Sequence, residues 1–118
     1  LGGVVSNKWA SEAPVLIVIC AVISLLPHKA GSFLKKIDYR LIDVGIAGEH
    51  LCLAAAEQGL GTCWIGWFKE RAVKKILDIP KKAKVVSLIT LGYPAGESSS
   101  EKERFDQEEV VFYEGYGS

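Results

Sequence analysis

Residues 43–68, DVGIAGEHLCLAAAEQGLGTCWIGWF, carry the strongest structural pattern in this chain. Apolar and small residues fill nearly every position before the glycine-rich end, and they predict a helix from about Asp38 to Gln58 that is mostly buried. The polar residues of this helix are spaced seven apart and form one stripe: Asp43, His50 and Glu57. Gly59 follows the last turn, where a left-handed residue commonly ends a helix.

Two other apolar segments predict strands. Residues 15–26, VLIVICAVISLL, form a run that is too short for a membrane span of about 20 residues. Their β-branched content favours a strand buried on both faces. Val85 to Leu91, VVSLITL, predicts a second buried strand, closed by the turn signal Gly92-Tyr93-Pro94.

The remaining elements are shorter. Thr62 to Trp67 predicts a short strand or extended loop, and the apolar spacing from Phe68 to Leu77 predicts a helix. Residues 95–109 are polar and predict a loop or tail, followed by a last short strand at Val110–Tyr113. Together the elements predict a single α+β domain over residues 1–118, or an α/β one, with helices covering a sheet.

Composition narrows the class of protein. Lys plus Arg and Asp plus Glu both number 14, which argues against a dedicated nucleic-acid binder. Three cysteines lie outside any C-x-x-C or metal-ligand spacing, and no signal peptide frames the first apolar run, so we expect a reduced, cytoplasmic protein without a membrane partner. The chain begins with Leu1 and contains no methionine, from which we expect a part of a longer protein or a processed product.

Familiar catalytic motifs are missing from the sequence. There is no P-loop, no G-x-S-x-G elbow and no H-E-x-x-H pair. Gly59-x-Gly61 is followed by Trp64 where a dinucleotide fingerprint requires glycine. For His28 and His50 a surface or capping role is favoured over acid–base chemistry. We therefore predict no catalytic side chain and no metal site.

Ligand contact is predicted for four consecutive residues that place apolar side chains on both sides of a glycine: Trp64, Ile65, Gly66 and Trp67. A backbone N–H beside glycine can approach a planar ring without a Cβ in the way. Lys102 and Arg104 are two apart, as in an anion site, but solvated ion pairs with neighbouring glutamates are the favoured interpretation from the residues alone. The basic residues of 69–84 are likewise interpreted as a solvated face, with attraction of a phosphorylated cofactor as the minority alternative.

Four stretches, in this order, resemble the nitroreductase family of FMN-dependent oxidoreductases: AP-VLIVIC (13–20), IDVGIAGEHLCLAAAEQGLGTCWIGWF (42–68), ILDIP (76–80) and VVSLITLGYP (85–94). The resemblance implies an α+β sheet-and-helix sandwich with FMN as cofactor and NAD(P)H as electron donor. The acceptor would be a nitroaromatic, a quinone or a similar small molecule. It also implies an intertwined homodimer with FMN at the subunit interface and the helix 38–58 in the dimer contact.

The resemblance also implies roles for the candidate residues. The segment 64–67 would lie against the isoalloxazine ring, with a backbone N–H near Gly66 or Trp67 directed at flavin N5, and Lys102 and Arg104 would reach the FMN phosphate. The family's N-terminal R-[RH]-S-x-R motif has no counterpart here. Two alternatives stay open: a non-catalytic fragment or dimerisation module that has lost stable FMN binding, and thiol redox chemistry at Cys52 or Cys63.

Overall fold

The structure is a computed structural model that describes residues 2–5, 8–22, 38–96 and 103–117. Three strands and three α-helices follow two short 3-10 helices. In chain order the elements are η1 (Gly2–Val4), η2 (Lys8–Ser11), β1 (Val15–Val22), α2 (Tyr39–Glu57), β2 (Gly61–Ile65), α3 (Glu70–Ile76), β3 (Ala83–Gly92) and α4 (Gln107–Val110). The predicted mixture of helices and a sheet is confirmed.

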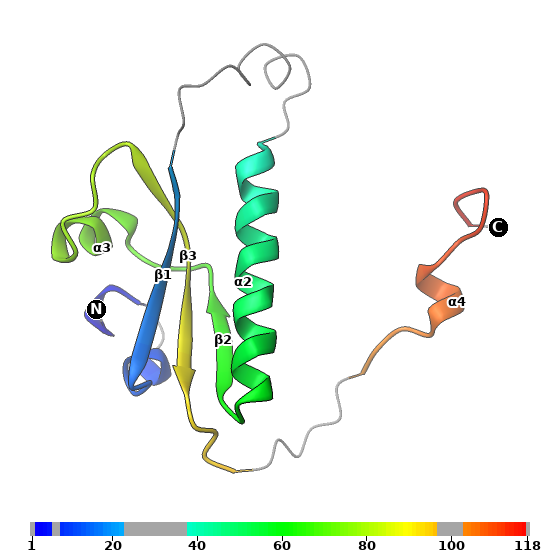
Figure 1. The fold of residues 1–118 in the computed structure, drawn as a ribbon, viewed down its shortest axis with the longest axis horizontal. Coiled ribbons are helices and arrows are strands. Elements are labelled where there is room, and N and C mark those ends of the chain that lie inside the picture. Colours follow the sequence, from blue (N-terminus) through cyan, green and yellow to red (C-terminus); the bar gives the residue numbers. More distant parts are fainter. Residues whose placement is uncertain (1, 6–7, 23–37, 97–102, 118) are drawn as a thin grey trace.

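The three strands form one antiparallel sheet in the order β1-β3-β2, so the last strand in sequence is central (Figure 1). β1 pairs with β3 from Val15↔Leu91 to Val22↔Ala83, with a bulge between Ile19 and Cys20. β2 pairs with β3 from Gly61↔Gly92 to Ile65↔Leu88. Both flanking strands therefore take their position from β3.

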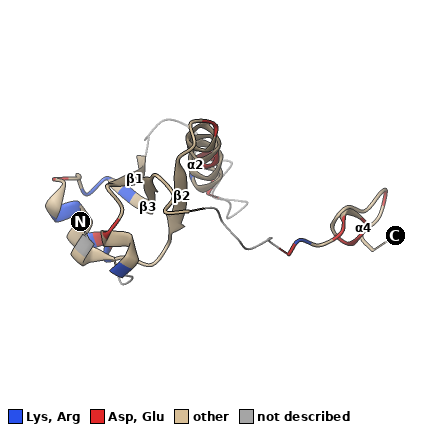
Figure 2. Ribbon diagram, turned by 90° about the horizontal axis from the view of Figure 1, so that it is seen from below, with Lys and Arg blue, Asp and Glu red and all other residues tan. Residues whose placement is uncertain are grey.

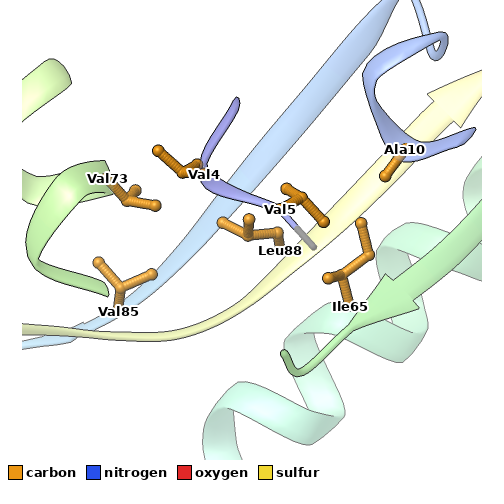
Figure 3. Close-up of a cluster of buried hydrophobic side chains, with 7 residues drawn as sticks. All are labelled: Val4, Val5, Ala10, Ile65, Val73, Val85 and Leu88. Carbon is orange, nitrogen blue, oxygen red and sulfur yellow. The ribbon is translucent and has the colours of Figure 1, made fainter. Parts of the chain in front are cut away.

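The two faces of the sheet are covered by different elements, because successive side chains of a strand point to opposite sides. On the first, which we call the α2 face, Trp64 of β2 and Ile19 of β1 lie close to Gly48 of α2. The second, the α3 face, carries Ile65 and Leu88. Figure 3 shows the buried cluster on that face, drawn from the N-terminal segment, the strands and α3: Val4, Val5, Ala10, Ile65, Val73, Val85 and Leu88.

Local interactions explain the bounds of α2. The Asp38 carboxylate caps its first turn by accepting a hydrogen bond from the Arg40 backbone N–H at 3.2 Å, and it also pairs with both Nε and Nη2 of the Arg40 guanidinium at 2.7 Å. The same guanidinium lowers the pKa of the Asp38 carboxyl. Gly59 has φ 73°, the left-handed conformation expected after the last turn.

The expected burial of two elements is wrong for the single chain. Only Val44, Gly48 and Ala55 of α2 are buried, while Ile46 and Leu53 are 54% and 60% exposed. β1 is partly buried along most of its length instead of enclosed on both faces. Within the described residues, each element has a neighbour on one side only. α2 packs on the sheet with one side, and β1 is an edge strand that pairs with β3 alone. Residues 23–26 of the predicted strand lie outside the described residues.

The strand predicted at Val110–Tyr113 is also wrong. A one-turn helix, α4, precedes it, and a reciprocal capping box joins the Asp106 and Glu109 side chains to each other's backbone N–H groups. Figure 1 shows residues 103–117, which we call the arm, extending away from the sheet. The arm carries large apolar side chains that are exposed: Phe105, Val110, Val111, Tyr113 and Tyr116.

Candidate functional site

The stretch that the sequence singles out begins inside the sheet. Ile65 ends β2 and is 4% exposed, packed in the cluster of the α3 face. Trp64 points to the opposite face of the sheet, where its indole ring lies over Gly48 of α2. These two side chains therefore hold the end of β2 from both sides. Ile65 is buried, whereas Trp64 keeps 38% of its surface exposed.

Gly66 and Trp67 form the open part of this stretch. A Cβ added at Gly66 would meet no atom within 4 Å, and the Trp67 side chain is 83% exposed. The backbone is held again directly afterwards, where Phe68 forms a bridge with Val5 and the Lys69 N–H donates to the Val4 carbonyl at 3.0 Å. The segment is thus a short open span anchored at both ends.

The Trp67 backbone N–H is a donor with an open hydrogen-bonding position. Within the described ranges no carbonyl or side-chain oxygen accepts a hydrogen bond from it. Donors in an ordered segment bind an acceptor without the cost of first ordering the backbone. A planar ligand with a ring nitrogen could therefore lie on Gly66 and accept from Trp67.

The tail pair is not brought to this segment within one chain. Lys102 lies outside the described residues, and Arg104 is an exposed residue of the arm, which leads away from the sheet (Figure 1). The open span at Gly66 and Trp67 has room for the ring of a flavin. The phosphate contact expected of Arg104 stays a prediction.

A concave region elsewhere on the sheet was missed by the sequence analysis. It is an open cleft of about 410 Å³ at the other end of β2, between Trp9, Cys63 and Tyr93. Thr90 lies beside Cys63 on the same face and donates a hydrogen bond to the Cys63 carbonyl at 3.4 Å. Sequence spacing could not predict this cleft, because it depends on the register of two antiparallel strands and on the position of η2.

The histidine and cysteine side chains that the structure describes have contacts of their own. His28 lies outside the described residues, and the exposed His50 shares a 2.9 Å hydrogen bond between its Nδ1 and the Ile46 carbonyl. Cys63 is exposed, and burial raises the pKa of the Cys20 thiol. In the part of the chain that the structure describes, no cluster of three or more His, Cys, Asp or Glu residues could hold a metal ion.

None of the helices that the structure describes combines the length and the apolar character that crossing a bilayer requires.

The model of the nitroreductase family matches residues 3–93, which include the whole sheet, α2, α3 and the open segment at Gly66 and Trp67. This chain belongs to the nitroreductase family.

The proteins that match this chain are longer than the chain itself. A protein of Methanothermobacter thermautotrophicus, provisionally named NADH dehydrogenase/NAD(P)H nitroreductase, is 31% identical over 109 residues, covering 88% of this chain and 52% of the relative. The structure of B. megaterium NfrA1 aligns with a TM-score of 0.75 at 27% identity, covering 98% of this chain and 51% of that one. An FMN-dependent nitroreductase from Clostridium difficile R20291 aligns with a TM-score of 0.68 at 25% identity, covering 90% and 60%. The chain spans about half the length of the curated relatives it matches.

Proposed function

We propose that this chain forms part of an FMN-dependent oxidoreductase that transfers electrons from NAD(P)H to a nitroaromatic, a quinone or a similar small acceptor. The observation that carries the proposal is the open span of Gly66 and Trp67, with its Trp67 N–H, inside the region that the family model matches. The names of two relatives support it, since one is called an NAD(P)H nitroreductase and another FMN-dependent. The redox chemistry would be that of the bound FMN.

This chain would contribute position and hydrogen bonding to that chemistry. Gly66 leaves room for the flavin ring, and the Trp67 N–H would donate to flavin N5. Trp64 and Ile65 would hold the backbone of this segment in place through α2 and the α3-face cluster. No side-chain acid or base is needed in this scheme, so the proposed catalytic contribution comes from the backbone.

We further propose that the working form is a homodimer in the cytoplasm. α2 exposes large apolar side chains, among them Ile42, Ile46 and Leu53, on the side away from the sheet. A second copy that covered them would remove this surface from water, at about 25 cal/mol per Å² of apolar area. A partner's body would also give the arm a surface to lie on and could bring Lys102 and Arg104 to a bound FMN phosphate.

Visible absorption of the purified chain, before and after incubation with FMN and removal of the excess, tests the proposal. Retained oxidised-flavin bands, which bleach when NADPH or NADH is added without oxygen, are the expected result. The double variant Lys102→Ala with Arg104→Ala should bind FMN more weakly, while Lys8→Ala, an exposed lysine of η2, should bind it as the native chain does. Native affinity in the double variant would remove the tail pair from the site.

A non-catalytic interaction module is the second candidate, because the exposed apolar surfaces of α2 and the arm also suit a chain that only assembles with others. It predicts a flavin-free spectrum, no uptake of FMN and self-association through α2. Thiol redox chemistry is less well supported, since the Cys63 thiol donates to the Trp64 carbonyl at 3.6 Å, a contact that favours the thiol over the reactive thiolate. Unchanged reductase activity after changing Cys52 and Cys63 to serine would eliminate it.

A further inference from the structure

Positive charge is concentrated directly after Trp67. Residues 69–84 contain seven Lys or Arg and two acidic residues, although the charges of the whole chain cancel. Figure 2 shows Lys and Arg gathered at the end of the molecule that carries α3, while Asp and Glu prevail on α2 and in the arm. The open segment at Gly66 and Trp67 therefore borders the most basic part of the chain.

The contacts of α3 determine which of its cations are available. Glu70 accepts a hydrogen bond from the Val85 N–H at 3.2 Å and pairs with Lys74 at 3.0 Å, which ties the helix to β3. Val73 is fully buried, so Arg71 and Lys75, one helical turn apart, lie on the outer side. Lys69, Arg71 and Lys75 are all exposed, and none of them has an ion-pair partner among the residues that the structure describes.

We propose that Lys69, Arg71 and Lys75 bind the phosphate groups of the nicotinamide nucleotide and thereby favour the donor that carries a 2′-phosphate, NADPH. This inference rests on the proposed function, and it names the electron donor of the same site. The three residues, which we call the α3 cations, form the predicted phosphate surface.

Chain geometry supports this placement. The Cα atom of Lys69 lies at most about 7 Å from that of Trp67, because two residues of extended chain span no more. Arg71 and Lys75 are separated by about 6 Å along the helix axis. In NADPH the pyrophosphate joins the two ribose units and the 2′-phosphate is on the adenosine ribose, so these phosphates lie away from the nicotinamide ring. A nicotinamide stacked on a flavin ring at Gly66 and Trp67 could therefore direct its phosphates along α3.

The chemistry of these side chains suits phosphate. Arg71 can donate two parallel N–H groups to one phosphate, and the lysines add charge that a flexible stem can move to its target. The 2′-phosphate adds a doubly charged group that NADH lacks. One further charge-assisted hydrogen bond is worth about 1.5–3 kcal/mol, which corresponds to at least about tenfold in affinity.

Isothermal titration of the full chain with adenosine 2′,5′-bisphosphate and with adenosine 5′-monophosphate tests the inference, because the two nucleotides differ only in the 2′-phosphate. We expect the bisphosphate to bind at least about tenfold more tightly. We also expect its affinity to fall more steeply with added salt, because more charge is paired in its complex. Equal affinity for the two nucleotides would overturn the proposal.

Variants locate the effect. Lys69→Gln with Arg71→Gln should reduce the preference for the bisphosphate to less than about twofold, since both donors nearest Trp67 are gone. Lys82→Gln is the matched control, because it removes one exposed positive charge from the same basic region at the far end of the loop before β3. A preference that survives the double variant, or that Lys82→Gln abolishes equally, contradicts a role for the α3 cations.

The phosphate of FMN is the other possible source of the same chemistry. Titrations with FMN and riboflavin separate the two, since riboflavin lacks the phosphate. If the double variant weakened FMN relative to riboflavin and left both adenosine nucleotides unchanged, the α3 cations would belong to the flavin and the NADPH proposal would be overturned. Inorganic pyrophosphate that bound as tightly as the bisphosphate would also overturn it, by showing attraction of any polyanion.

These titrations need neither bound flavin nor turnover. A chain without flavin that still prefers the bisphosphate would support the phosphate surface and count against the oxidoreductase proposal. A chain that binds FMN but binds the bisphosphate and the monophosphate equally would support the oxidoreductase proposal and overturn the phosphate surface.

Discussion

The indole ring of Trp64 occupies the space that a side chain at Gly48 would need. A Cβ at Gly48 would lie 2.5 Å from Cζ2 of Trp64 and 3.1 Å from Cδ1 of Ile19. α2 and β2 can therefore approach as they do only because position 48 carries no side chain.

Gly48→Ala should lower the free energy of unfolding by about 1–3 kcal/mol, as expected for an extra methyl group in a packed interface. Urea denaturation measures the change. In a double-mutant cycle with Trp64→Leu, the smaller side chain should relieve part of the clash and give a coupling of about 1 kcal/mol or more. Simple additivity of the two substitutions would mean that the indole ring is not the obstacle.

Gly66→Ala should weaken FMN binding and leave the stability of the fold nearly unchanged. A methyl group there meets no atom within 4 Å, so the free energy of unfolding should change by less than about 0.5 kcal/mol. FMN affinity should fall at least about tenfold, because the methyl group stands where the ring would approach. Gly96→Ala, equally free of contacts but in a loop, should alter neither quantity. Native flavin affinity in Gly66→Ala would argue against this segment as the ring contact.

Substitutions on the exposed side of α2 should act on assembly. Ile46→Lys and Leu53→Glu replace side chains that are 54% and 60% exposed in one chain, so each should cost the isolated fold less than about 1 kcal/mol. If α2 forms the dimer contact, each charge should shift the molecular mass seen by sedimentation equilibrium from dimer to monomer. Lys81→Gln, which also changes the charge by one unit but lies near β3, serves as the control. A dimer that persists in both α2 variants would place the interface elsewhere.

The Glu70 carboxyl should make part of the stability pH-dependent. Its hydrogen bond with Lys74 lowers its pKa below the ordinary value of 4.5, and the Val85 N–H contributes in the same direction. A lowered pKa in the folded state means that the stabilisation is present above pH 4.5 and is lost as the pH falls through the folded-state pKa. Because the side chain is 39% exposed, we expect less than about 1 kcal/mol.

Urea midpoints at pH 6 and at pH 3 test this. Glu70→Gln should lower stability at pH 6, and its effect should shrink towards pH 3 as the pH falls through the folded-state pKa and the native carboxyl becomes protonated as well. Lys74→Met should reproduce most of the loss at pH 6. An equal loss at both pH values would show that the charge of Glu70 is not responsible.

Ser87 is a polar residue that is buried in the sheet. Its side chain is on the α2 face of β3, the residue is 7% exposed, and its hydroxyl has no hydrogen-bond partner among the described residues. Ser87→Ala removes the hydroxyl without adding volume and should stabilise the fold by about 1 kcal/mol. A clear loss of thermal stability in this variant would indicate a partner that the hydroxyl needs, such as a buried water.

The sequence predicted best where its pattern was local. The bounds expected for α2, Asp38 to Gln58, differ from the observed helix by one residue at each end, because the Asp38 cap and Gly59 act within one turn. The long apolar run 85–91 is likewise a strand, extended to Ala83–Gly92 by pairing on both sides. The resemblance to the nitroreductase family could also be seen in short stretches of consecutive residues.

Features that depend on contacts between distant parts of the chain could not be predicted from the sequence. The apolar character of α2 predicted burial, but one sheet covers only one side of a helix, so Ile46 and Leu53 stay exposed in a single chain. At the tail, β-propensity at 110–113 favoured a strand, yet no strand among the described residues pairs with this region, and the capping box of Asp106 and Glu109 forms a helical turn that ends at Val110. The alternation of a strand already separates Trp64 from Ile65, but which of the two joins the α2 face and which the α3 face depends on the pairing with β3.

The strand order has a consequence for how the chain folds as it is made. β1 and β2 are both synthesised before β3, yet neither pairs with the other, because β3 lies between them. Partners such as Val15 and Leu91 are separated by more than half of the chain. The backbone hydrogen bonds between the strands can form only after residues 83–92 have left the ribosome. Loop closure over such distances slows folding. Nascent chains should therefore acquire their sheet late and in one step, with the apolar residues of 15–22 and 39–57 exposed to chaperones until then.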